Sequence, residues 1–286
     1  MDGHPYVIDD YFGQKGILSI LTILIIHDEM KLEKYHGLGN NFLITKYKEN
    51  INYALLSVKL CNSNLSIGAD GLIVYKKDPL EIFIYNKDGS EALMCGNGLR
   101  CFLHYSFFNG LLQNKRKNIE VITKSGIYKS DIISTIPFQS KVEFKRSLIR
   151  KEVIGLFNEM YESYYVKVGV KHNVIVIDEK NEKQVEILKE NLLKYGTFCE
   201  ETNIDIVTKI NKNTIKVLTY ERGVGFTSSC GTGGVASALV SNYLYDCSSE
   251  LYVINEYGKL KVTIEGSKVY MEGPSERICS LEVIND

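Results

Sequence analysis

Two cysteines of this chain stand in the same short sequence pattern. Cys95 begins Cys-Gly-Asn-Gly and Cys230 begins Cys-Gly-Thr-Gly, and each tetrapeptide leads into an apolar stretch of helical character. The first turn of a helix leaves backbone N–H groups without partners, and the helix dipole adds positive potential there. Glycines in that turn let a carboxylate approach the amides closely. The pattern therefore predicts an anion site beside a thiol, twice in one chain.

The position of each cysteine also bears on the acidity of its thiol. A free thiol has a pKa of about 8.5, and lowering it to about 7 takes on the order of 2 kcal/mol, which a helix dipole in an enclosed pocket can supply. A lone cysteine more often packs in the core. Two cysteines facing each other across a pocket can instead remove a proton from one side of a carbon and return one on the other. We therefore predict inversion of a stereocentre, with one thiolate and one thiol at rest, since two adjacent thiolates repel each other.

Helices and strands must hold the two cysteines in place. The apolar patterns predict about a dozen strands and fewer helices, the latter at 53–61, 98–109, 185–195 and 234–245. The helices after Cys95 and Cys230 are apolar nearly all round, so they must be buried. Each is followed by several strands. The sequence thus predicts an α+β chain of two pseudo-symmetric halves, each wrapping strands around one central helix.

Composition limits the kinds of function to consider. The chain has 286 residues, 44% of them apolar and 24% charged, and a formal net charge of −1. This balance gives no reason to expect nucleic acid or a membrane as partner. Seven cysteines without the C-x₂-C spacing of zinc sites favour reduced thiols in the cytoplasm and no metal. We assign Cys61, Cys101, Cys199, Cys247 and Cys279 to packing or the surface.

The first 29 residues are set apart from the rest. The apolar run Gly16–Ile26 is too short to cross a bilayer, which takes about 20 residues. Acidic residues precede it where a signal peptide would be basic. Met30 begins a natural first strand. We expect residues 1–29 to be an extension, disordered or a start-site artefact, that activity does not need.

From Met30 to about Pro274 the chain resembles the diaminopimelate epimerase family. Each matching segment is weak alone, but the set in this order and spacing is specific. The segments are His36–Phe42, Gly68–Leu72, Tyr85–Glu91, Met94–Cys101, Asn203–Asp205, Tyr220–Gly225 and Cys230–Gly233.

The resemblance implies both a fold and a reaction. Each half would be a β-barrel-like sheet around its central helix, with the active site in the cleft between them. Residues 30–140 plus 273–286 would form the N-terminal half and 141–272 the C-terminal half. The reaction would interconvert LL- and meso-2,6-diaminopimelate for lysine and peptidoglycan precursors, without pyridoxal phosphate, metal or any other cofactor. The partner would be a small-molecule amino acid, and a homodimer is a further expectation.

The resemblance also implies roles for individual residues. Cys95 and Cys230 would be the acid and base, and His172 and Glu221 would help them exchange protons. The reacting carboxylate would bind the backbone amides of Gly96, Asn97, Gly231 and Thr232, and the distal end of the substrate would bind Asn86, Asn203, Glu221 and Arg222, with Asn40 as another pocket asparagine.

Three departures from the family pattern bear on the substrate. Val170 stands where many members have an asparagine that contacts the distal end, Gly71 replaces a glutamine, and Phe226 stands where Glu or Leu is common. One alternative is therefore a cofactor-independent racemase of another amino acid, such as histidine or hydroxyproline. The other is a non-catalytic, redox-sensing binding protein whose facing thiols form a reversible disulfide at about 4 Å between Cβ atoms.

Overall fold

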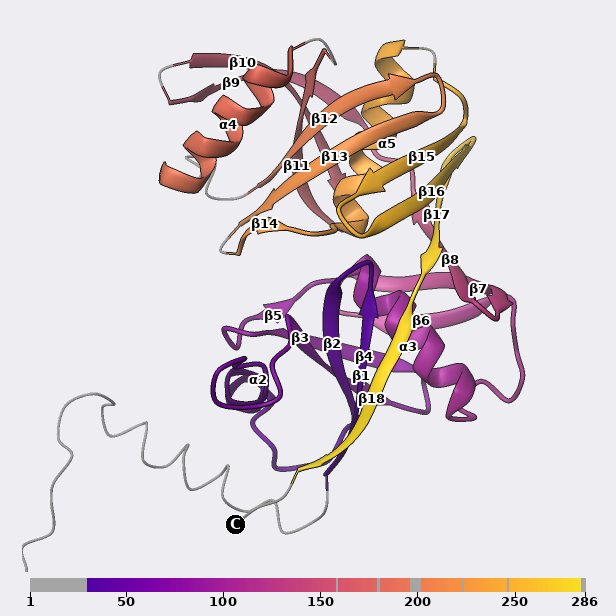
Figure 1. The fold of residues 1–286 in the computed structure, drawn as a ribbon. Helices are drawn as coiled ribbons and strands as arrows, with labels where there is room; N and C mark the ends of the chain where they lie inside the picture. The colour runs from indigo at the N-terminus through magenta and orange to yellow at the C-terminus, as the bar shows by residue number, and fades with distance from the viewer. Residues whose placement is uncertain are drawn as a thin grey trace, which may run out of the picture.

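The computed structural model describes residues 30–157, 159–178, 181–195, 202–222, 224–245 and 247–283. The predicted extension at 1–29 and Cys199 lie outside the described residues. Two halves lie one above the other, and the chain crosses between them where β17 runs into β18 (Figure 1).

The lower half in Figure 1 encloses helix α3 (Gly96–Phe108). This helix packs against β1, β2, β8 and β18, and its Leu99, Phe102 and Leu103 are fully buried. Helix α2 (Tyr53–Leu60) covers β3 and β4 from outside. The strands are β1 (Met30–Gly37), β2 (Asn40–Lys46), β3 (Gly71–Lys76), β4 (Glu81–Asn86), β5 (Glu91–Ala92), β6 (Ile119–Thr123), β7 (Gly126–Thr135), β8 (Phe138–Lys145) and β18 (Glu276–Val283).

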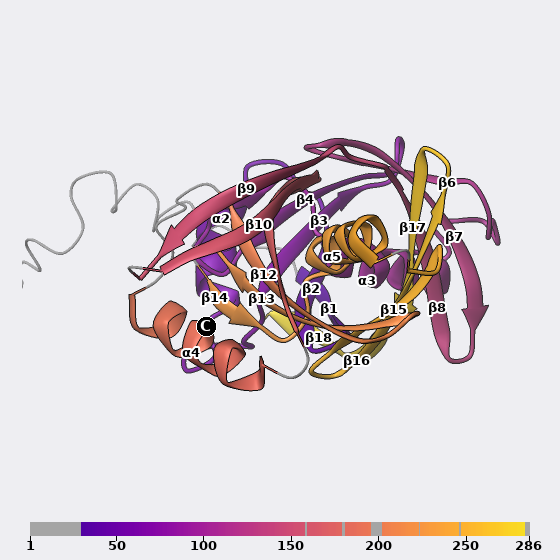
Figure 2. The ribbon, with the colours of Figure 1, turned by 90° about the horizontal axis from the view of Figure 1, so that it is seen from above.

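The upper half encloses helix α5 (Gly231–Tyr245), which Figure 2 shows inside the curve of the strands. Every residue of α5 from Gly231 to Ser241 is buried, as a helix that is apolar nearly all round requires. Helix α4 (Glu182–Tyr195) lies outside and inserts Leu188 and Leu192 into a second cluster of buried residues. The strands are β9 (Ile149–Leu156), β10 (Glu159–Val168), β11 (Val170–Ile177), β12 (Asn203–Asn211), β13 (Thr214–Glu221), β14 (Gly225–Thr227), β15 (Glu250–Asn255), β16 (Gly258–Glu265) and β17 (Lys268–Pro274).

The pairing pattern of the strands repeats from one half to the other. β2 and β3 pair in parallel around α2, as β11 and β12 do around α4. β4 and β6 pair in parallel around α3, as β13 and β15 do around α5. The other neighbours in each half are antiparallel: most are hairpins, such as β7–β8 and β16–β17, and β1 pairs with the distant β18. This matching order confirms the predicted α+β fold of two pseudo-symmetric halves.

The two halves share strands at their junction. β8 pairs with β17 antiparallel, so one half continues into the other through backbone hydrogen bonds. Both predicted boundaries, at 140/141 and 272/273, fall inside these two strands; the division into 30–140 plus 273–286 and 141–272 stays a prediction. No helix in the described part of the chain is both long and apolar enough to cross a membrane.

Candidate active site

Each of the two cysteines precedes the first turn of a buried helix. Cys95 is the N-cap residue of α3, with extended backbone (φ −137, ψ 119), and its Sγ accepts the Gly98 N–H at 3.5 Å. Cys230 precedes α5, and its Sγ accepts the Gly233 N–H at 3.3 Å. A sulfur that accepts a first-turn amide holds the cap position in which serine or aspartate is usual. The structure therefore confirms the predicted placement of both thiols at helix starts.

The starts of α3 and α5 touch each other. A Cβ on Gly96 would lie 3.5 Å from the Gly231 Cα, and a Cβ on Gly231 would lie 3.3 Å from the Gly96 Cα. The Asn97 side chain donates to the Ser229 carbonyl at 2.7 Å and ties the two turns together. A side chain at either position would be tight against Met271, at 3.0 Å from its methyl carbon for Gly96 and 3.1 Å from its sulfur for Gly231, so glycine fits best at both. The two helix dipoles thus meet beside one cavity.

That cavity has a volume of about 720 Å³ and lies between the halves. Its wall includes all but one of the predicted site residues: Asn40, Asn86, Cys95, Gly96 and Asn97 from the lower half, and Asn203, Glu221, Arg222, Cys230, Gly231 and Thr232 from the upper half. Val170 and Phe226, two of the departures from the family pattern, line it as well. Because the halves repeat one topology, the wall is built from matching places in both: the ends of β4 and β13 and the starts of α3 and α5.

Asn40 and Asn203 are both held firmly at the cavity wall. Asn40 donates to the Asp70 carboxylate at 3.1 Å, and its Oδ1 accepts from Asn97 at 3.3 Å and lies 3.7 Å from the Cys95 sulfur. The Asn203 Oδ1 accepts the Arg222 backbone N–H at 3.0 Å. Residues fixed in this way are preorganised for a ligand.

His172 is the predicted site residue that does not line the cavity. It is fully buried, with Nδ1 at 2.6 Å from the Asp205 carboxylate and Nε2 at 3.0 Å from the Thr232 hydroxyl. The Thr232 hydroxyl lies 3.4 Å from the Cys230 sulfur. Thr219 donates to the other Asp205 oxygen at 2.7 Å. His172 thus reaches Cys230 through one hydroxyl, in a buried relay that ends at Asp205.

Asp205 is absent from the residues that sequence reasoning selected as functional. Its signal is a carboxylate inside an apolar strand: Ile204, Ile206 and Val207 around it are all buried. A buried carboxylate needs a partner. His172 is this partner. In the parallel register of β11 and β12, His172 pairs with Asn203, which lies two residues before Asp205.

Glu221 shares the cavity with both thiols. Burial raises the pKa of its carboxyl, while the Thr227 hydroxyl, which donates to Oε1 at 2.6 Å, lowers that pKa. The negative charge of Glu221 in turn raises the pKa of Cys95 and of Cys230. The protonation states of the Glu221 carboxyl group and the two thiols are therefore coupled, because a negative charge on one raises the pKa of the others.

The acidity expected of the two thiols is wrong in sign. Burial raises the pKa of Cys95 to about 11 and, together with the charges of Glu221 and Asp205, raises the pKa of Cys230 well above its usual value. The first-turn amides of Gly98 and Gly233 lower these pKa values but do not overcome burial. Removing a thiolate from water costs more than the helix start returns. The enclosure therefore favours the protonated form of both groups.

Alkylation of Cys95 by iodoacetamide tests this resting state. The thiolate is the reacting species, so we expect the rate in the folded protein to rise about tenfold per pH unit from pH 7 to 10 without levelling off, because the pKa of Cys95 is raised to about 11. Mass spectrometry of the Cys95 peptide gives the rate. The same peptide in urea is the control and should level off near a pH of about 8.5. A plateau of the alkylation rate below pH 8 in the folded protein would show instead that Cys95 rests as a thiolate.

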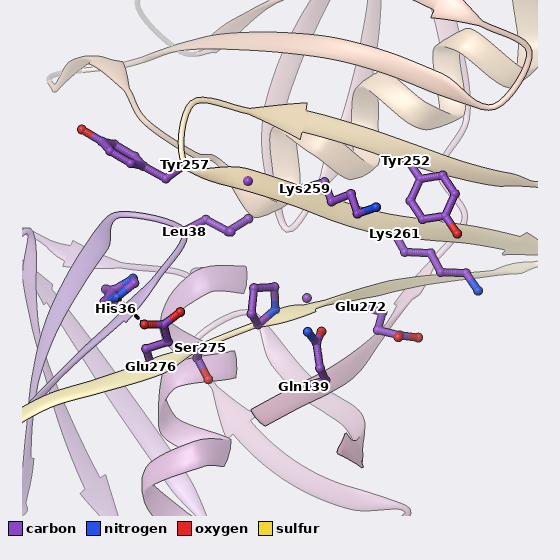
Figure 3. A pocket seen from close by; sticks show the side chains of 13 residues that line it. His36, Leu38, Gln139, Tyr252, Tyr257, Lys259, Lys261, Glu272, Ser275 and Glu276 are labelled. Atoms are coloured by element: carbon purple, nitrogen blue, oxygen red, sulfur yellow. Dashed lines mark ion pairs between the residues drawn. The ribbon is translucent and has the colours of Figure 1, made fainter. Parts of the chain in front are cut away.

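A second cavity, of about 480 Å³, opens at the junction of the halves and is shown in Figure 3. It has no cysteine among its described lining residues. Some of its polar groups have partners: His36 lies 3.6 Å from the Glu276 carboxylate, and Lys261 pairs with Glu250 at 2.8 Å. The first cavity, with its two thiols, is the candidate active site.

Comparisons with known proteins show which proteins this chain is similar to. A family model described as diaminopimelate epimerase matches residues 32–136 and 164–278. A protein named diaminopimelate epimerase from Caldanaerobacter subterraneus subsp. tengcongensis is 34% identical over 272 residues, which cover 89% of this chain and 99% of that protein. One of the same name from Methanocella arvoryzae is 36% identical over 276 residues, covering 89% and 97%.

Solved structures share the fold at much lower sequence identity. A hydroxyproline epimerase from Agrobacterium vitis, solved with trans-4-hydroxy-L-proline, has a TM-score of 0.65 and 12% identity over 89% of this chain and 91% of that one. A phenazine biosynthesis protein of the PhzF family from Bacillus anthracis has a TM-score of 0.64 and 14% identity over 90% and 100%. At these identities the likeness concerns the fold alone.

Proposed function

This chain belongs to the diaminopimelate epimerase family, a family of isomerases, and from that membership we propose that it interconverts LL- and meso-2,6-diaminopimelate by proton transfer between the substrate and two thiols, Cys95 and Cys230. The observation that carries the mechanism is the meeting of two cysteine-capped helix starts at one cavity. In this mechanism the two thiols alone transfer protons on the two faces of the substrate α-carbon.

The helix starts hold the reacting end of the substrate. Its carboxylate accepts from the first-turn amides of Gly96, Asn97, Gly231 and Thr232, which places the α-carbon between the two sulfurs. When the α-proton leaves, negative charge spreads onto that carboxylate. Fixed amides aimed at developing charge stabilise it without reorganisation, a contribution of about 3 kcal/mol per donor in other enzymes.

Each turnover moves one proton off the α-carbon and a different one onto it. The thiolate first forms when a thiol gives its proton to Glu221, whose carboxyl has a raised pKa, and the ammonium group of the substrate offsets the remaining charge. The thiolate then takes the α-proton, and the opposite thiol protonates the carbanion on its other face. The stereocentre is inverted, and the thiolate has changed sides. The relay through Thr232 and His172 orients Cys230 for this exchange.

The distal end of diaminopimelate carries a second ammonium and a second carboxylate. Arg222 lines the cavity, and its guanidinium suits a carboxylate through two parallel hydrogen bonds. Asn86 and Asn203 lie beside it in the wall and supply amide groups. Val170 removes one polar contact at this wall, so Arg222 is the main determinant of selectivity for a substrate with a distal carboxylate.

Isotope exchange tests substrate and mechanism together. Incubation of the reduced protein with LL-diaminopimelate in heavy water should give meso product with deuterium at the inverted carbon, read by mass spectrometry and NMR. The control is a panel that includes histidine and hydroxyproline, which lack the distal zwitterion and should not exchange. Strong exchange on a panel member with none on diaminopimelate would favour the other racemase activity. No exchange on any substrate would favour a redox-sensing binding protein.

We also propose a cytoplasmic location. The support is that the cysteines in the described part of the chain are free thiols, as is usual in a reducing compartment. Fractionation of cells that produce the protein tests it. The expected homodimer stays a prediction, and light scattering of the purified protein decides it.

A further inference from the structure

Arg100 is a fully buried cation without an acidic partner. It lies on α3, five residues after Cys95, with no exposed surface. Its Nε donates to the Pro274 carbonyl at 3.2 Å and one NH₂ group to the Met271 sulfur at 3.6 Å. The other NH₂ group has no hydrogen-bond partner, and no carboxylate in the described part of the chain forms an ion pair with Arg100. Burying an unpaired charge costs several kcal/mol of stability. A role of Arg100 in the reaction would explain why this cost is tolerated.

The guanidinium lies directly behind the two catalytic turns. The Met271 side chain links them: a Cβ on Gly96 would lie 3.0 Å from the Met271 methyl carbon, and a Cβ on Gly231 would lie 3.1 Å from the Met271 sulfur. The same sulfur accepts from Arg100 on its other side. The cation therefore lies close enough to Cys95 to act on the charge of its thiol, while remaining shielded from water.

The charges that act on Cys95 come from both halves. Glu221, on β13, raises the pKa of the Cys95 thiol, whereas the backbone amides of Gly98 and Asn97 and the charge of Arg100 lower it. Arg100 is thus the one positively charged side chain among the main influences on this thiol. Charge–charge interactions in such a low-dielectric interior are several times stronger than in water. The buried cation is placed to offset the negative charge that Cys95 acquires when it loses its proton.

We propose that Arg100 is a positioning residue for Cys95, and that its buried guanidinium stabilises the Cys95 thiolate from behind the helix start during turnover. The inference rests on the proposed role of Cys95 as an acid and base. Its rival is a purely structural role, in which Arg100 anchors α3 to the segment that joins the halves through the Pro274 carbonyl.

Two substitutions separate charge from anchoring. Arg100→Met keeps the bulk and removes the charge, and Arg100→Lys keeps the charge but not the planar donors. In the full chain we expect Arg100→Met to slow alkylation of Cys95 by iodoacetamide severalfold at pH 8, since loss of the cation raises the pKa of that thiol. Arg100→Lys should stay close to the unsubstituted protein. Alkylation of the half-buried Cys279 in the same digest is the internal reference and should not change.

Thermal unfolding gives the second readout. The proposal predicts that Arg100→Met unfolds at the same temperature or higher, because replacing a buried unpaired charge with an apolar side chain is often neutral or stabilising. An unchanged alkylation profile would overturn the proposal. If Arg100→Met does not fold, Arg100→Gln, which can still donate to the Pro274 carbonyl, takes its place. Failure of both uncharged variants to fold would assign Arg100 the structural role instead.

The alkylation readout does not depend on turnover, so the two proposals fail separately. If the reduced protein does not exchange deuterium into any substrate but Arg100→Met still slows alkylation, the proposed function fails and the electrostatic role of Arg100 stands. If the unsubstituted protein exchanges deuterium normally but Arg100→Met does not change the alkylation profile, the proposed function stands and the electrostatic role of Arg100 fails.

Discussion

Cys95→Ala and Cys230→Ala should each abolish epimerisation, lowering turnover by at least about 10³-fold, within the range that loss of a positioned acid or base produces. Both sulfurs line one cavity, and no other described side chain of that cavity is a thiol. Each variant keeps one acid–base group on one side of the α-carbon. It can therefore remove a proton from one epimer and return it to the same face, but it cannot invert the centre.

Heavy water makes this distinction measurable. Each variant should exchange the α-proton of one epimer with retention of configuration, and the two variants should act on opposite epimers. Cys101→Ala is the matched control, since Cys101 lies on the same helix, is fully buried in the core and does not line the cavity. It should epimerise normally. Inversion by either Cys95→Ala or Cys230→Ala would exclude the two-thiol mechanism.

Gly233→Ala is the second change with a large expected effect. A Cβ at this position would lie 2.4 Å from Asp205 Oδ1 and 2.8 Å from Thr219 Oγ1, both on fully or almost fully buried side chains. Either the Asp205 carboxylate or the start of α5 must move. We expect a loss of about 1–3 kcal/mol in the free energy of unfolding, as for other overpacked interiors. Turnover should fall as well, since Asp205 holds His172, which contacts Thr232 beside Cys230.

The neighbouring glycine supplies the control for this change. A Cβ on Gly234 would lie 3.4 Å from both Leu260 Cδ1 and Val253 Cγ1, which is ordinary contact. Gly234→Ala should therefore leave stability and turnover nearly unchanged, with the higher helix propensity of alanine worth up to about 1 kcal/mol in its favour. Chemical denaturation and the epimerisation assay report both quantities. Equal behaviour of the two variants would show that the Asp205 contact is unimportant.

Local sequence was enough to predict the catalytic turns and most of the strands. A cysteine followed by glycines and an apolar stretch specifies a helix start from neighbouring residues alone, and Cys95 and Cys230 both lie at such starts. Strands β9 and β18 escaped prediction because at least half of their side chains are exposed, which obscures the alternation. Backbone pairing forms these strands: β9 forms a hairpin with β10, and β18 pairs with β1 from the other end of the chain.

By itself, the sequence determined the duplication and the two helix-start thiols, because each depends on short-range pattern, while most of the cavity wall was implied by the resemblance to the family. Only the tertiary structure decided which groups are charged. Enclosure between the halves raises the pKa of Cys95 and Cys230 against the pull of their helix starts, since desolvation depends on everything that surrounds a group. The same enclosure pairs Asp205 with His172 behind Thr232 and leaves Arg100 unpaired, because the distance between two charges is fixed by packing and not by their separation along the chain.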